Sequence, residues 1–140
     1  GYEMRQVCVY DLELIDIKNF FESMLGRSSH GLFYSIGQMI GRNIAREASH
    51  EHERFFEIVS KKIKERNFVE EIYFDNDTVT VFGSVEVHNS DHNTCDILRG
   101  ILVIVYEFYR KSKNKLYCEE IECASVNGNK CVFKIEEDIV

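Results

Sequence analysis

The spacing of apolar residues changes along the chain, and this change constrains the fold more than any other feature. From Asp11 to Gly26, and again over 28–48 and 51–66, apolar side chains recur every three or four residues, which predicts three helices. The segments 69–74 and 78–87 are instead rich in β-branched and aromatic residues, which predicts two strands of a hairpin. Helices and strands therefore follow one another within a single chain.

The remaining segments complete a mixed pattern. Residues 3–10 could form a short strand, and the β-branched run 95–109 has the length of a buried helix, capped by Asn93 or Thr94. Segments 116–126 and 130–135 flank Asn127-Gly128, a strong hairpin signal. We therefore expect an α+β fold with helices packed on one face of an antiparallel sheet, and one domain over residues 1–140.

Composition excludes several classes of protein. The net charge of −7 repels phosphate backbones, so we expect no nucleic-acid partner, and the basic cluster 110–115 is interpreted as a solvated turn. We expect no membrane span, because the sequence has no stretch of 18 apolar residues, and we find no signal peptide. An odd number of cysteines, five, favours reduced thiols or metal ligands over disulfides, which indicates a cytoplasmic location.

A stripe of small residues marks the second predicted helix. Gly37, Gly41, Ala45 and Ala48 recur at three or four residues and leave one helix face smooth. Glycine inside a helix costs about 0.5–1 kcal/mol relative to alanine, so two on one face need a reason. Close approach of another backbone, a ligand, or a second copy of the helix in a homodimer would each supply one.

Three cysteines and a glutamate carry the most specific chemistry. Cys95, Glu120, Cys123 and Cys131 offer three thiolates and a carboxylate, which satisfy a tetrahedral zinc ion. Such a set leaves a local charge of −2, so backbone N–H groups or Lys130 must compensate. Two alternatives remain open: Cys118 could replace one ligand, or all of these residues could be buried, reduced cysteines without metal.

The register of the last hairpin bears on this site. A two-residue turn at Asn127-Gly128 would place Cys123 and Cys131 on opposite faces of the sheet, whereas a three-residue loop makes them diagonal neighbours on one face. Diagonal neighbours lie roughly 7–8 Å apart, which disfavours a disulfide. Glu120 falls on the other face from Cys123, so the strand must bulge or bend between them if both bind one metal.

The order of these motifs resembles the 4-vinyl reductase domain family over residues 12–136. The resemblance rests on Gly37-x3-Gly41, Cys95-x4-Gly100 and Glu120-x2-Cys123-x7-Cys131-x-Phe133. The family is related to the ligand-binding fold of nitric-oxide-signalling and Golgi-transport proteins. The resemblance implies an α+β domain that dimerises and encloses an apolar pocket, with one zinc on the residues matching Cys95, Glu120, Cys123 and Cys131.

We therefore expect a small-molecule-binding or sensing domain for an apolar or aromatic ligand, braced by a structural zinc. A protein-assembly scaffold, or an accessory factor or reductase of tetrapyrrole metabolism, is the alternative. No phosphate loop, nucleophile elbow or dinucleotide fingerprint occurs, so an enzyme is less expected. His88 and His92 flank a polar loop, and two histidines alone do not define a site. The aromatic residues expected to line the pocket are Phe33, Phe55, Phe56, Tyr106 and Tyr109.

Overall fold

The computed structural model describes residues 3–137. Helices form in the segments where the sequence predicts them. They are α1 (Asp11–Leu25), α2 (Ser28–Ala48), the short 3-10 helix η1 (His52–Arg54), α3 (Phe55–Glu65) and α4 (Asp96–Arg110). Gly26, with φ of 62°, ends α1, and Asn67, also with φ of 62°, follows α3 as expected of a residue that ends a helix. Within residues 3–137, no helix is long and apolar enough to cross a membrane.

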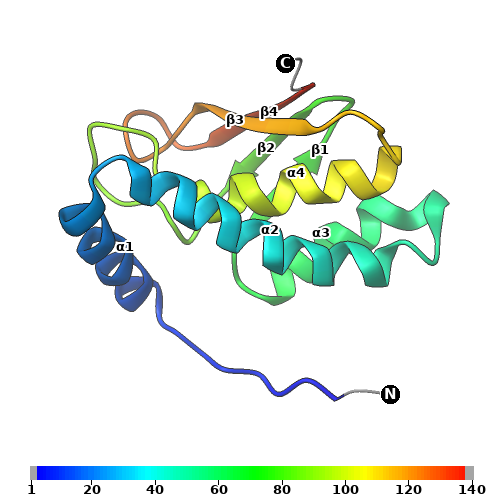
Figure 1. Cartoon of the computed structure of the whole chain (residues 1–140), viewed down its shortest axis with the longest axis horizontal. Helices are drawn as coiled ribbons and strands as arrows, with labels where there is room; N and C mark the ends of the chain where they lie inside the picture. The colour runs from blue at the N-terminus through cyan, green and yellow to red at the C-terminus, as the bar shows by residue number, and fades with distance from the viewer. Residues whose placement is uncertain (1–2, 138–140) are drawn as a thin grey trace.

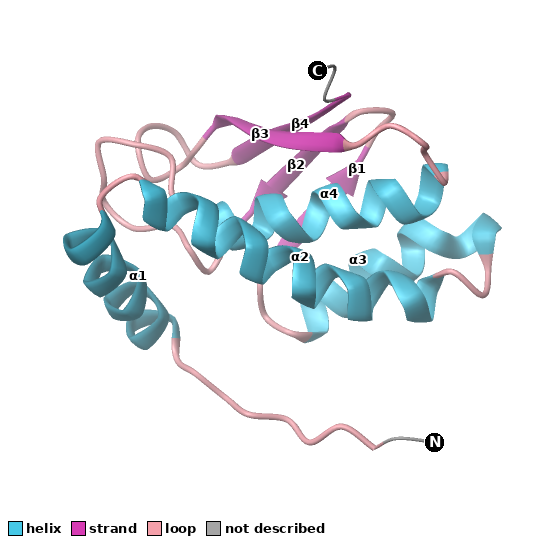
Figure 2. Ribbon diagram, in the orientation of Figure 1, coloured by secondary structure: helices cyan, strands magenta, loops and turns pink. Residues whose placement is uncertain are grey.

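The four strands form one antiparallel sheet. They are β1 (Glu71–Phe74), β2 (Thr78–Phe82), β3 (Leu116–Glu122) and β4 (Cys131–Glu137), in the order β1-β2-β4-β3. Strand β4 of the second hairpin pairs with β2 of the first, and this pairing joins the two hairpins. Helices α2, α3 and α4 lie on one side of this sheet, while α1 stands at one end (Figures 1 and 2). The α+β prediction is confirmed.

Helix α4 is the centre of the core. Its apolar side chains from Ile97 to Tyr106 are almost completely buried between α2 and the sheet. A helix with apolar residues on all sides must be covered on all sides, which is why the β-branched run 95–109 folds as a central helix. The N-terminal end of α4 lies beside the end of β3 and the start of β4, and this contact positions the cysteines described below.

The glycine stripe of α2 faces α4 within the same chain. A Cβ atom added at Gly37 would lie 2.0 Å from the carbonyl oxygen of Ile97, and one added at Gly41 would lie 2.9 Å from that of Ile101. Gly100 makes the reciprocal contact, since its added Cβ would lie 2.0 Å from the carbonyl oxygen of Tyr34. The stripe therefore serves close packing of two helices of one chain and cannot also form the helix contact of a homodimer.

Three local predictions were wrong. Residues 3–10 form no strand, because this segment leaves the body of the fold and finds no partner strand (Figure 1). Strand β2 ends at Phe82 and not at Val87, because Gly83 adopts a φ of 67°. Neither Asn93 nor Thr94 caps α4: its N-cap residue is Cys95, and a distant carboxylate takes the free N–H groups.

Candidate metal centre

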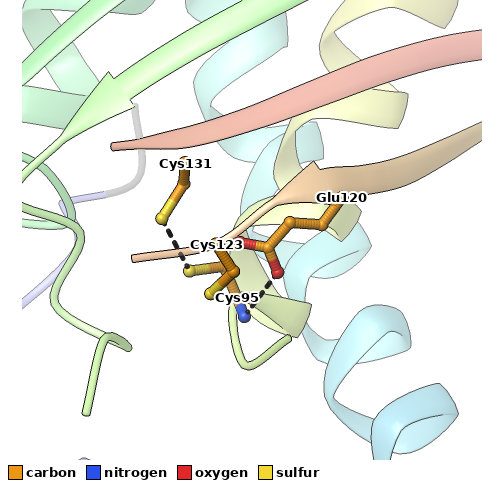
Figure 3. A group of neighbouring side chains, drawn as sticks. All are labelled: Cys95, Glu120, Cys123 and Cys131. Atoms are coloured by element: carbon orange, nitrogen blue, oxygen red, sulfur yellow. Dashed lines mark hydrogen bonds between the residues drawn. The ribbon is translucent and has the colours of Figure 1, made fainter. Parts of the chain in front are cut away.

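The four predicted ligands converge although they come from three segments of the chain. Cys95 precedes the first turn of α4, Glu120 and Cys123 lie at and just beyond the end of β3, and Cys131 begins β4 (Figure 3). All four are buried, and one ligand atom from each lies within 4.8 Å of every other. The structure therefore brings together a compact set of three sulfur atoms and one carboxylate.

The last hairpin reaches this arrangement by a route that neither expected register describes. Glu120 pairs with Phe133 and Glu122 with Val132, so the register shifts between Glu120 and Glu122. The strand then ends, and the carbonyl of Cys123 accepts hydrogen bonds from the N–H groups of Val126 and Asn127 in a turn. The expected bulge between Glu120 and Cys123 is confirmed, whereas the expected strand pairing of Cys123 is wrong.

The distances within the cluster suit a tetrahedral ion. Cys95 Sγ and Cys131 Sγ are 3.8 Å apart. Two sulfur atoms on a tetrahedral zinc with Zn–S bonds of about 2.3 Å are separated by roughly 3.8 Å. Backbone N–H groups also point into the site: that of Cys95 donates to Glu120 Oε1 at 3.0 Å, and that of Ala124 to Cys131 Sγ at 3.4 Å.

Glu120 Oε2 is a buried oxygen atom without a hydrogen-bond partner within the described residues. An unsatisfied buried polar atom costs about 1–3 kcal/mol, and more when the group is charged. Its position beside three thiols is the position of a ligand facing a cation. The residues present therefore fit a zinc ion on chemical grounds, by donor type, spacing and an otherwise unexplained oxygen atom.

The pKa values of the clustered acidic groups are displaced in opposite directions. Burial raises the pKa of Glu120 to about 8. Hydrogen bonding to Cys123 raises the pKa of Cys131 to about 12, while Cys131 and Cys95 lower the pKa of Cys123 far below its usual value. A bound dication would favour the deprotonated form of each of these groups, because metal ligands must be deprotonated.

The other two cysteines and Lys130 lie outside this set. Cys118 is buried on β3, and burial raises the pKa of its thiol, but it is absent from the group of converging ligand atoms. Cys8 is exposed in the N-terminal segment. Lys130 is also exposed, so the charge compensation visible in the structure comes from backbone N–H groups.

A buried ion network beside the cluster was not predicted from the sequence. Lys18 of α1 contacts Glu86 at 2.7 Å, Asp96 at 3.6 Å and the carbonyl oxygen of Thr94. Glu86 in turn accepts hydrogen bonds from the N–H groups of Ile97 and Leu98, both at 2.9 Å, and thereby caps α4. Burial raises the pKa of Glu86, and Lys18 opposes that shift. No local motif marks Glu86, because its partners lie elsewhere in the sequence.

The five aromatic residues expected around a pocket divide into two places. Phe55, Phe56, Tyr106 and Tyr109 pack against one another, with ring centroids between 4.5 and 5.3 Å apart. Phe33 lies apart from them and lines a small hollow between α1, the start of α2 and the loop 88–94. That hollow has room for about one water molecule. Four of the five side chains thus form one aromatic cluster of the core.

Comparison with solved structures places this architecture among known folds. The phenol-responsive sensory domain of the transcription activator PoxR superposes with a TM-score of 0.79 at 14% identity, over 96% of this chain and 77% of the other. A vinyl-4-reductase family protein from Methanocaldococcus jannaschii superposes with a TM-score of 0.62 at 19% identity, over 96% and 84%. No family model and no curated protein matches the sequence. The expected resemblance is confirmed at the level of the fold.

Proposed function

We propose that this chain is a single small-molecule-binding or sensing domain whose fold is braced by one structural zinc ion. The observation that carries the zinc is the buried, unsatisfied Glu120 Oε2 beside the sulfur atoms of Cys95, Cys123 and Cys131. The ligand-binding half of the proposal is supported by the shared fold with a phenol-responsive sensory domain. At the identity found, that likeness supports a class of function and not a particular ligand.

A zinc ion on these residues would join segments that the backbone leaves separate. It would hold the N-terminus of α4 through Cys95 to the end of β3 and the start of β4. With four protein ligands the site has no open position, which is typical of a structural site. All five cysteines are free thiols, and thiols persist in reducing compartments, which supports a cytoplasmic location.

Metal analysis tests the zinc directly. Protein purified without a metal-affinity tag or chelator should contain about one tightly held zinc per chain, and Cys123→Ser or Cys131→Ser should lose it. Its removal should lower the melting temperature, because binding free energy is folding free energy in such sites. Cys118→Ser is the matched control: it places a hydroxyl in the core and costs stability, but it should retain the metal.

Two results would contradict the zinc proposal. If the purified protein holds no tightly bound metal, and Cys95, Cys123 and Cys131 react freely with an alkylating agent in the folded state, the zinc proposal fails. Retention of zinc by both Cys123→Ser and Cys131→Ser would also contradict it.

The proposed ligand is a small apolar or aromatic molecule bound in the aromatic cluster of Phe55, Phe56, Tyr106 and Tyr109. Phe33, which was also expected to line the pocket, lies apart from this cluster. Phe56 is only partly buried and touches the rings of Phe55, Phe74, Tyr106 and Tyr109, so it is the side chain best placed to yield to a ligand. Aromatic and apolar side chains of this kind line most small-molecule sites.

Phenol is the first probe for this ligand site. A ligand at about 100 times its dissociation constant stabilises a protein by about 2.7 kcal/mol, which thermal unfolding detects. Phenol or a larger apolar compound should raise the melting temperature of the wild type and shift the NMR signals of the aromatic cluster. Phe56→Leu should weaken the effect. No stabilisation by any aromatic compound tested would contradict ligand binding and favour the scaffold alternative.

A homodimer is the proposed assembly, through a different surface from the one first expected. The N-terminal segment and α1 expose large apolar side chains: Val7, Tyr10, Leu12, Phe20 and Met24 are between 59% and 86% exposed. Such side chains favour burial against a partner. Sedimentation should give about twice the chain mass of 16.4 kDa. A monomer at micromolar concentration would contradict the dimer, and a stoichiometric second protein would support the scaffold.

A further inference from the structure

Two histidines and a glutamate meet at the small hollow, outside the cysteine cluster. Glu22 comes from α1, His30 from the first turn of α2, and His92 from the loop before α4. Glu22 Oε2 lies 3.2 Å from His30 Nε2 and 3.3 Å from His92 Nε2. The two imidazole rings stand edge to face with centroids 5.3 Å apart. Two Nε2 atoms are therefore directed at the same carboxylate oxygen.

The second nitrogen of each ring is held by another carboxylate. His30 Nδ1 lies 2.9 Å from Asp96 Oδ2, and His92 Nδ1 lies 2.8 Å from Asp91 Oδ1. A carboxylate at Nδ1 fixes the ring orientation and favours the tautomer that carries its proton on Nδ1. The lone pair of each Nε2 then faces the hollow. This carboxylate–histidine pairing typically supports metal-binding imidazoles.

We propose that Glu22, His30 and His92 form a second, open site for a divalent transition metal of the zinc type. A tetrahedral zinc with Zn–N and Zn–O bonds of about 2.0–2.1 Å separates its ligand atoms by roughly 3.3 Å. The observed separations of 3.2 and 3.3 Å match that value. Three protein ligands leave one position, and the adjoining hollow has room for about one water molecule. The site is thus of the open kind, unlike the four-ligand cysteine cluster.

A metal here would connect three segments that lie far apart in the sequence. The ligands lie on α1, on α2 and in the loop 88–94 that leads into Cys95. Occupancy would fasten α1 to the body of the domain, in addition to the buried contact of Lys18 with Glu86. The alternative arrangement is an ion pair between Glu22 and protonated histidines, which needs no metal. The number of zinc ions bound per chain distinguishes the metal site from the ion pair.

The experiment titrates zinc into protein that retains its tightly bound metal. After gel filtration in a buffer with micromolar zinc, wild-type protein should hold about two zinc ions per chain, one of which a mild chelator removes. His92→Gln and Glu22→Gln should lose that exchangeable ion only. His50→Gln, at an exposed turn after α2, is the matched control and should retain it. Cobalt in this site should show weak visible bands without intense sulfur-to-metal charge transfer.

The tests of the two metal sites are independent of each other. If wild-type protein binds no exchangeable zinc, or if His92→Gln and Glu22→Gln retain it, the second site is overturned whatever the cysteine cluster holds. Cys123→Ser reports on the cysteine cluster alone and should leave the exchangeable ion in place. The side chain of His92 is 43% exposed, so its substitution should leave the unfolding transition of the metal-free protein unchanged, which a denaturant titration checks.

Discussion

Replacement of Gly37 by alanine tests whether the glycine stripe exists for the contact between α2 and α4. The added methyl carbon would lie 2.0 Å from the carbonyl oxygen of Ile97 and 3.0 Å from Gly100 Cα. Both atoms belong to the backbone of α4, so no flexible side chain can move aside. The two helices would have to separate, and α4 is packed against the sheet on its other side.

The magnitude follows from two opposing effects. Overpacking a core costs about 1–3 kcal/mol, and contact with a fixed backbone puts this case near the upper end. Alanine recovers about 0.5–1 kcal/mol because glycine is the poorer helix former. We therefore expect Gly37→Ala to lower the free energy of unfolding by about 2 kcal/mol.

Gly31→Ala is the matched control on the same helix. Gly31 lies in the first turns of α2, and an added Cβ would meet nothing within 4 Å. This variant should gain up to about 0.5–1 kcal/mol. Urea unfolding should then separate the two variants by about 1–1.5 M in midpoint, for a slope of roughly 2 kcal/mol per M. Equal midpoints for Gly37→Ala and Gly31→Ala would refute the close packing of α2 on α4.

Three further changes have directions fixed by the structure. Lys18→Met should lower the free energy of unfolding by about 3–5 kcal/mol, because it leaves buried Glu86 without its cation. The control Lys61→Met, at an exposed position, should change the free energy of unfolding by less than about 0.5 kcal/mol, and urea unfolding compares the two variants. Burial raises the pKa of Tyr34 to about 12. Since the unfolded chain releases this proton first, stability should fall as pH rises from about 10 towards 12, and Tyr34→Phe should lessen that fall in urea titrations at high pH. Lys111→Gly should raise the melting temperature, because Lys111 follows α4 with a φ of 50°, which glycine adopts without strain; a lower value would contradict this.

The sequence by itself determined the order of elements and the ligand types of the candidate metal centre. The spacing of apolar residues located α1 and α2, because a helix places residues three and four apart on one face. This spacing is a property of the sequence and can be recognised without the folded structure. Even the ambiguous run 95–109 was assigned correctly, since its length suits a helix better than a strand. The Glu-x2-Cys-x7-Cys spacing likewise marked candidate metal ligands before the fold was known, with buried, reduced cysteines as the open alternative.

Only the tertiary structure decided how these parts meet. The bulge after Glu120, and not a regular hairpin register, brings Cys123 towards Cys131. Glu86 caps α4 and contacts Lys18 across 68 residues of sequence, a pairing that no local pattern contains. The sequence marked His92 only as one of two histidines that flank a polar loop, and it did not mark His30; both converge on Glu22 only because α1 stands beside the loop before α4. Such contacts depend on how helices and strands pack together, and packing is a property of the folded chain as a whole.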